Sequence, residues 1–313
     1  MMSGHFRVRA AGLLAGAGLL ATAACGSGAA ETAASSTAAP GEKPRVVTAF
    51  YPLQWLAERV GGADIDVSVL TAPGVEPHDL ELGAQQIADL EDATLAVYIK
   101  GVQPAVDDAL AQQADRAFDA ATAVPTLPAA EHAGEEAHEH EHEVSYDPHL
   151  WLDPSRFATV AGKLGERMAQ ADPAHAQAYK DRAAKTAADL SALDQEMTKG
   201  LTNCTSKTMV TSHEAFGYLA DRYKLKQVGI TLDPESEPSP ARIAEVAKLA
   251  NAEKVTTIFT EALVSPKVAE VLAQEVHAKT AVLDPLEGKP GSGDYLTQMR
   301  QNLKTLQTAL GCA

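Results

Sequence analysis

Short hydrophobic runs alternate with amphipathic stretches along most of this chain. "RVVTAF" (45–50), "DVSVL" (66–70) and "TLAVYIK" (94–100) have the length and composition of buried strands. Between these strands, residues 52–60 and 83–91 have apolar residues at helical spacing and are predicted to be helices. Strands that alternate with helices predict a parallel sheet with helices on both faces.

The second half repeats this alternation. We therefore predict an α/β protein with two parallel-sheet lobes, the first over 45–171 and the second over 202–313. The strands expected in the second lobe are 207–212, 226–232, 255–261 and 280–285, and the helices lie near 214–223, 239–251, 266–277 and 294–310.

One long helix is predicted to join the lobes, over residues 172–201. Asp172 provides an N-cap and Pro173 the first helical position, and neither Gly nor Pro follows until Gly200. A helix of about 27 residues is roughly 40 Å long. Such a connector is rigid, so we expect limited motion between the lobes.

The N-terminus has the pattern of an export signal. Two arginines precede an apolar run over 10–24 that is too short to span a bilayer, so 1–24 is predicted to be a signal peptide. "LATAAC" resembles a bacterial lipoprotein box in which Cys25 is lipidated, although Thr22 stands where that pattern prefers Leu. Plain cleavage after an Ala is the alternative. Residues 25–44 are small and polar, which predicts a flexible tether.

Composition and charge limit the kinds of partner that this protein is expected to bind. Hydrophobic residues make up 45% and charged residues 22%, as in soluble globular proteins. The net charge of −16 becomes −18 once residues 1–24, with two arginines and no acids, are removed. This charge argues against nucleic acid as a partner, and we expect membrane contact only through the lipid anchor. In an exported protein the remaining pair, Cys204 and Cys312, is expected to form a disulfide, with two separate buried thiols as the alternative.

Four candidate ligands follow predicted strands or precede a helix: His78, His149, His213 and Asp284. In open parallel sheets, ligands gather outside the carboxyl ends of the strands. A lone His in a loop is usually a surface residue, but here two candidates come from each half and share one sheet edge. Three imidazoles and a carboxylate suit zinc, whereas Ca²⁺ and Mg²⁺ prefer oxygen.

Several of these stretches resemble the zinc/manganese solute-binding proteins of ABC transporters. The motifs are "GVEPHDLE", "DPHLWLDP", "TSHEAFGYLADRY" and "VLDPLEG", together with the Asp-Pro-capped connecting helix. They occur in the family's order and extend from Arg45 to the C-terminus. The resemblance implies two α/β lobes bridged by a long rigid helix, with the metal in the cleft between them, and its ligand positions fall on the four candidates above. In that family a histidine at the third position, here His213, goes with zinc, and a glutamate goes with manganese.

The same resemblance gives meaning to the His/Glu-rich segment 131–143. Many zinc-binding members carry such a loop just before the second ligand. Alternating His and Glu cannot form a packed core, so a mobile loop is expected. It either collects zinc weakly or is a solvated linker whose histidines bind metal incidentally. The accessory candidates are His132, His138, His140 and His142.

We therefore expect an extracytoplasmic, monomeric zinc-binding protein, either lipid-anchored or periplasmic. It would capture Zn(II) and deliver it to the permease and ATPase of an ABC importer. Asp284 as a fourth ligand would close the site, and the sequence predicts no H-E-x-x-H helix and no G-x-S-x-G elbow, so we expect no enzymatic activity. The alternatives are manganese or iron capture, a periplasmic zinc chaperone or an adhesin. Glu76 and Glu261 are candidates for accepting hydrogen bonds from ligand imidazoles, with surface salt bridges as the alternative.

Overall fold

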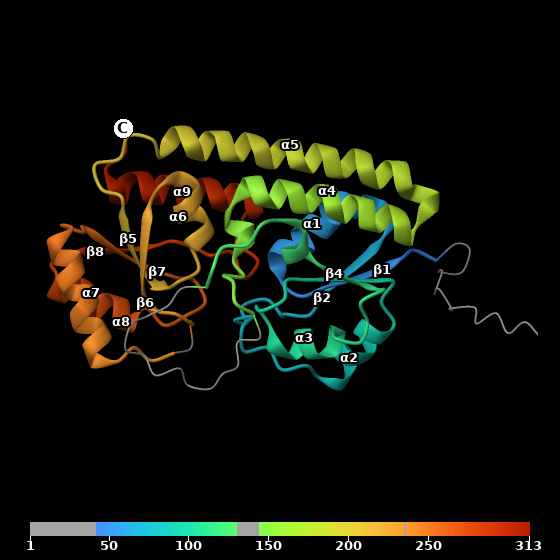
Figure 1. The fold of residues 1–313 in the computed structure, drawn as a ribbon, viewed down its shortest axis with the longest axis horizontal. Coiled ribbons are helices and arrows are strands. Elements are labelled where there is room, and N and C mark those ends of the chain that lie inside the picture. Colours follow the sequence, from blue (N-terminus) through green and yellow to red (C-terminus); the bar gives the residue numbers. More distant parts are fainter. Residues whose placement is uncertain (1–41, 130–143, 235) are drawn as a thin grey trace, which may run out of the picture. The chain divides into compact units, whose positions relative to one another are not determined.

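Two four-stranded parallel sheets organise the protein (Figure 1). The computed structural model describes residues 42–129, 144–234 and 236–313, and the described residues belong to one compact unit. The strand orders are β2-β1-β3-β4 in the first lobe and β6-β5-β7-β8 in the second, and every pairing is parallel. This confirms the predicted fold class.

The first lobe contains all the strands and helices expected there, and it adds two that the hydrophobic pattern did not reveal. These are α3, which has 7 residues, and β4, whose 3 residues are too few for a clear periodicity. Its strands are β1 (Arg45–Thr48), β2 (Asp66–Val69), β3 (Leu95–Tyr98) and β4 (Ala117–Asp119), and its helices are α1 (Tyr51–Gly61), α2 (Ala84–Glu91), α3 (Pro104–Leu110) and α4 (Pro154–Ala171).

The second lobe follows the predicted order. Its strands are β5 (Thr208–His213), β6 (Lys226–Thr231), β7 (Thr257–Thr260) and β8 (Lys279–Val282), and its helices are α6 (Gly217–Tyr223), α7 (Pro240–Ala252), α8 (Lys267–Glu275) and α9 (Tyr295–Leu310). The helix expected from residue 214 begins at Gly217 instead. His213 is therefore the last residue of β5, and a short turn separates it from α6.

The connecting helix is α5 (Ala176–Gly200), preceded by the 3₁₀ turn Pro173–His175. Asp172 is the N-cap of this turn and Pro173 its first residue, as predicted, but the Asp172 side chain makes no capping hydrogen bond. Its carboxylate instead accepts from the Tyr179 hydroxyl at 2.7 Å and pairs with His175 at 2.6 Å. The helix packs against α1 and α4 of the first lobe and against α9 of the second.

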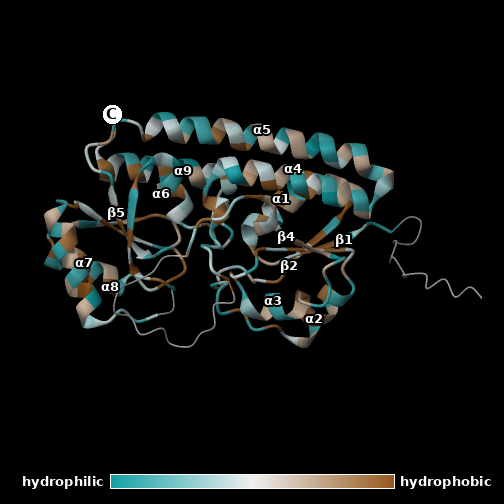
Figure 2. Cartoon of the chain, in the orientation of Figure 1, coloured by the Kyte–Doolittle hydropathy of each residue, from teal (hydrophilic) through white to brown (hydrophobic). Residues whose placement is uncertain are grey.

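Most of the hydrophobic core is continuous through both lobes. One cluster of buried residues extends from β1 and α1 through α4 and α5 to α9, and a smaller one lies among β5, β6, β7, α7 and α8. Figure 2 shows mainly hydrophobic strands and many hydrophilic residues along α5. Within the described ranges, no helix is long and apolar enough to cross a membrane.

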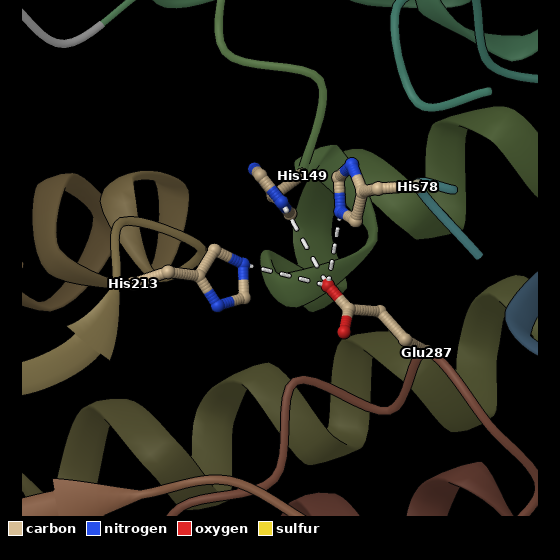
Figure 3. A group of neighbouring side chains, drawn as sticks. All are labelled: His78, His149, His213 and Glu287. Carbon is tan, nitrogen blue, oxygen red and sulfur yellow. Dashed lines mark hydrogen bonds and ion pairs between the residues drawn. The ribbon is translucent and has the colours of Figure 1, made fainter. Parts of the chain in front are cut away.

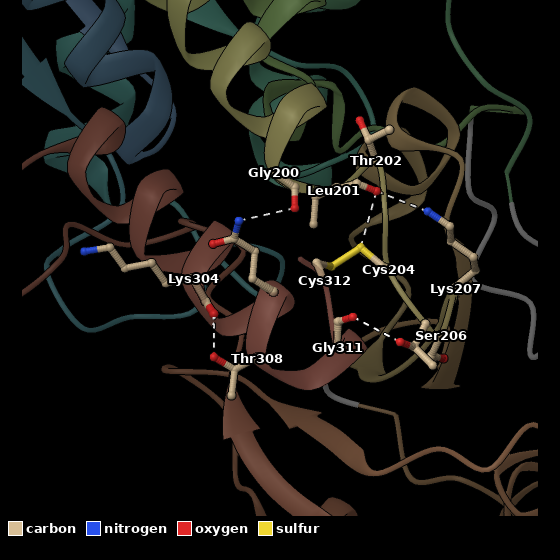
Figure 4. The surroundings of a disulfide bond; sticks show 12 residues. Gly200, Leu201, Thr202, Cys204, Ser206, Lys207, Lys304, Thr308, Gly311 and Cys312 are labelled. Atoms are coloured by element: carbon tan, nitrogen blue, oxygen red, sulfur yellow. Dashed lines mark hydrogen bonds between the residues drawn. A yellow bond between two sulfur atoms is a disulfide. The ribbon is translucent and has the colours of Figure 1, made fainter.

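A disulfide between Cys204 and Cys312 confirms the predicted pairing (Figure 4). It joins the segment after α5 to the residue that follows the C-cap of α9. Backbone hydrogen bonds accompany it, from Thr205 N to Gly311 O at 3.2 Å and from Ser206 N to Leu310 O at 3.0 Å. The bridge lies before the first residue of β5, whereas His213 lies at the end of that strand.

Candidate metal centre

Three histidines and one glutamate converge on a single point between the lobes (Figure 3). His78, His149, His213 and Glu287 each offer one ligand atom, and these atoms all lie within 4.8 Å of one another. Three of the four residues are buried and His78 is partly buried. The group draws two residues from each half of the chain, as the sequence analysis expected for the metal site.

Each histidine of this group is placed by local structure. His78 lies in the loop after β2, where its backbone N–H donates to the Glu76 carboxylate at 2.9 Å. His149 directly precedes the 3₁₀ turn Leu150–Leu152, which leads into α4. His213 ends β5, whose register with β6 pairs it with Thr231.

Carboxylates fix the orientation of two imidazoles. Asp147 Oδ1 lies 2.7 Å from His149 Nδ1, and Glu261 Oε2 lies 2.7 Å from His213 Nδ1. Because a carboxylate accepts, each Nδ1 carries a proton, and in the neutral imidazole Nε2 is then the nitrogen that can bind a metal. The His149 and His213 Nε2 atoms are buried and have no hydrogen-bond partner among the described residues. Such a pair of carboxylate-oriented imidazoles is typical of metal sites.

The spacing of the ligand atoms fits a tetrahedral ion. Glu287 Oε1 lies 3.3 Å from His78 Nε2, 3.8 Å from His149 Nε2 and 3.6 Å from His213 Nε2. Bonds of about 2.0–2.1 Å to a tetrahedral zinc place its ligand atoms about 3.4 Å apart. The three distances from Glu287 are close to this spacing, as expected for a site that can hold such an ion.

The electrostatics of the group also favour a cation. Burial opposes the charged form of His213, but Glu261 and Glu287 outweigh it and raise the pKa of this imidazole well above its usual value. Burial likewise opposes the charged form of His78, but Glu287 and Glu76 raise its pKa. Burial would raise the pKa of Glu287, yet the neighbouring His213 and His78 imidazoles hold it well below its usual value. In the metal-free protein, protons thus supply positive charge that a metal would otherwise provide.

Asp284, the predicted fourth ligand, is not a member of this group, and Glu287 is its fourth residue instead. The Asp284 carboxylate accepts a hydrogen bond from the backbone N–H of Leu286 at 2.8 Å, which closes a tight turn. Burial raises the pKa of Asp284 to about 6. Both acids lie in "VLDPLEG", three residues apart, and the sequence alone did not reveal which of them the turn would direct at the histidines.

The structure also locates the other candidates. Glu261 accepts from the imidazole of His213, whereas Glu76 accepts from the backbone of His78, and burial raises the pKa of Glu76 to about 7. Asp147, which was not among the predicted site residues, takes the corresponding role beside His149. Its position two residues before a predicted ligand was the available signal. The accessory histidines His132, His138, His140 and His142 and the lipidation candidate Cys25 lie outside the described residues.

A pocket adjoins the group and is lined by both His78 and His149. Glu214, Asp233 and Asp147 also line it, and no lysine or arginine does so among the described residues. The negative charge of these walls favours the approach of a cation.

Known proteins are similar to this chain in sequence and architecture. Residues 46–309 match the family described as "Zinc-uptake complex component A periplasmic". The "Zinc-binding protein AdcA" of Streptococcus pyogenes is 36% identical over 287 residues, covering 85% of this chain but 56% of that protein. This chain thus spans about half the length of that relative. The "High-affinity zinc uptake system protein ZnuA" of Bacillus subtilis is 34% identical over 312 residues, covering 93% of this chain and 94% of that protein.

A solved structure extends the likeness to three dimensions. The crystal structure of Zn(II)-bound AdcA from Streptococcus pneumoniae has a TM-score of 0.73 and 30% sequence identity to this chain. The match covers 86% of this chain and 58% of that one.

Proposed function

Because the chain belongs to the zinc-uptake complex component A family, we propose that it captures Zn(II) between its lobes for delivery to an ABC importer. One observation supports this most strongly. Four ligand atoms from both lobes lie within 4.8 Å of one another, and two of them are buried nitrogen atoms without a hydrogen-bond partner among the described residues. Buried polar atoms rarely remain unsatisfied unless a ligand takes them. We assign His78, His149, His213 and Glu287 as the zinc ligands.

The donor atoms support zinc over manganese and iron. Three imidazole nitrogens and one carboxylate oxygen suit a borderline ion in a four-coordinate site. Manganese prefers carboxylate, carbonyl and water oxygen, and non-haem iron sites typically combine two histidines and a carboxylate with open positions. The zinc names of the relatives agree with this choice.

The same donor set supports a role in binding over catalysis. A catalytic zinc has three protein ligands and an open position for water or substrate. Four protein ligands would leave no such position. Two carboxylates beside the group, Asp147 and Glu261, are engaged with imidazole N–H groups, which is a structural role and not that of a free base.

The setting of this function follows from the family and from the N-terminus. The family is described as periplasmic, and a lipoprotein is named among the relatives. We infer that the protein acts outside the cytoplasm, held by lipidated Cys25 or free in the periplasm, as a monomer. Its partners would be a permease and the ATPase that drives it. If these three proteins work together, zinc uptake should require this protein, the permease and the ATPase.

A competition titration against a chromophoric zinc chelator tests the ligand assignment. Replacement of His213 by Ala or of Glu287 by Gln should weaken zinc binding strongly, since each removes one of four ligands. Asp284→Asn is the matched control, because an Asn side chain can still accept from the Leu286 N–H. If Asp284→Asn weakens binding as strongly as Glu287→Gln, or if Glu287→Gln binds like the parent, the assignment of Glu287 is wrong.

A further inference from the structure

The turn that carries Glu287 is held at several points. Asp284 Oδ1 accepts from Leu286 N at 2.8 Å, and Asn302 on α9 binds Asp284 on both sides, accepting from its N–H at 3.1 Å and donating to its carbonyl at 2.7 Å. Leu286 has a φ of 63°, in the left-handed region that non-glycine residues rarely adopt. Such a conformation persists only where the surrounding structure holds it in place.

A contact from outside the second lobe holds the same turn. The indole N–H of Trp151, in the 3₁₀ turn before α4, donates to the Pro285 carbonyl at 2.7 Å. The Tyr295 hydroxyl, at the start of α9, donates in turn to the Trp151 carbonyl at 2.5 Å. Trp151 and Tyr295 are completely buried.

The positions of these residues in the chain link two metal ligands. Trp151 lies two residues after His149, and Pro285 lies two residues before Glu287. The indole hydrogen bond therefore joins the segment that presents a ligand from before α4 to the turn that presents a ligand from after β8. A side chain needed only for packing would not require this N–H, which must find an acceptor once it is buried.

We propose that Trp151 is a positioning residue for Glu287: its indole N–H fixes the Asp284–Glu287 turn so that the carboxylate meets the three imidazoles. This inference rests on the proposed zinc site and adds a determinant of its geometry. A displaced turn would leave the three histidines in place but withdraw the one anionic ligand. Residues that orient metal ligands typically contribute about 10- to 100-fold to metal affinity.

A double-mutant cycle tests this proposal on the full protein. Zinc affinity is measured by chelator competition in the parent, Trp151→Phe, Glu287→Gln and the double variant. Trp151→Phe should weaken zinc binding by about 10-fold or more in the parent, yet change it little when Glu287 is already replaced. Unchanged affinity in Trp151→Phe, or an equal loss in both backgrounds, would overturn the proposal.

Two further variants separate positioning from stability. Trp55→Phe is the matched control, because Trp55 is also buried between the lobes but donates to Asp294, at 3.3 Å, and not to the turn. It should lower the melting temperature without coupling to Glu287. If Trp151→Phe fails to fold, Tyr295→Phe takes its place in the same double-mutant cycle with Glu287→Gln. This variant removes only the hydroxyl that is bound to the Trp151 carbonyl. Failure of the parent to bind zinc would instead refute the proposed function.

Discussion

Replacement of Glu261 by Gln should weaken zinc binding although Glu261 is not a ligand. Its two carboxylate oxygens accept from both N–H groups of His213, with Oε1 3.0 Å from the backbone N and Oε2 2.7 Å from Nδ1. The Glu261 side chain is 2% exposed, so water cannot replace either bond. Gln offers one acceptor and one NH₂ donor, and the donor must then face a second donor.

Either orientation of the Gln amide is expected to weaken zinc binding. If the amide N–H groups face Nδ1, the imidazole is driven to the tautomer that carries its proton on Nε2, and that nitrogen can no longer bind metal. If they face the backbone N–H, a buried donor is left unpaired, at a cost of about 1–3 kcal/mol. Loss of such a partner typically weakens metal binding about 10- to 100-fold, or about 1.4–2.7 kcal/mol.

Chelator competition measures this loss, with Glu214→Gln as the control. Glu214 follows His213 in the chain, but its carboxylate accepts from the backbone of Gly229 at 3.1 Å. Because Glu261 also raises the pKa of His213, the comparison belongs at alkaline pH, where proton competition is small in both proteins. The reasoning is refuted if Glu261→Gln binds zinc as tightly as the parent there, or if Glu214→Gln loses as much.

Three further expectations concern stability, stoichiometry and pH. Replacing both Cys204 and Cys312 by Ser opens a loop whose ends are 108 residues apart. The free energy of unfolding, measured by denaturant titration, should fall by about 2–4 kcal/mol, while the zinc stoichiometry should not change. Equal unfolding free energies of the variant and the parent would contradict this expectation. Deleting 131–143 should keep the tight site and remove weaker zinc equivalents in calorimetry; an unchanged isotherm would exclude a collecting role. The pKa values of His78 and His213 are raised in the metal-free fold. Protonation of these two histidines therefore stabilises the metal-free fold fully below about pH 6.5, the pKa of a histidine in the unfolded chain. This stabilisation is lost as the pH rises through the raised pKa values. The increase in melting temperature on adding zinc should therefore grow with pH, and a constant or falling increase would contradict this sign.

The fold and three of the four residues in the group were predictable from local patterns. Strands and helices of ordinary length have a hydrophobic period, and polar residues that end parallel strands meet at one sheet edge. His78 and His213 follow from that rule alone, and a rigid Asp-Pro setting singled out His149. The shortest strand, β4, was missed because 3 residues show no clear period, and α3 was missed although α6, which also has 7 residues, was predicted.

The fourth residue of the group, Glu287, could not be predicted in the same way. Asp284 lies nearer to the strand end, and the rule of strand ends therefore favoured it over Glu287. The choice depends on a left-handed residue at Leu286 and on a contact with Trp151, more than 130 residues away in the chain. Neither a non-glycine residue with positive φ nor a long-range hydrogen bond leaves a pattern in the sequence.

Anomalous diffraction at the zinc edge, on crystals of protein purified without added metal, tests the central claim most directly. We expect one strong zinc peak bonded to Nε2 of His78, His149 and His213 and to a carboxylate oxygen of Glu287, at about 2.0–2.2 Å from each. A peak bound to Asp284 in place of Glu287, an anomalous signal from manganese or iron, or no peak among the three imidazoles would contradict it.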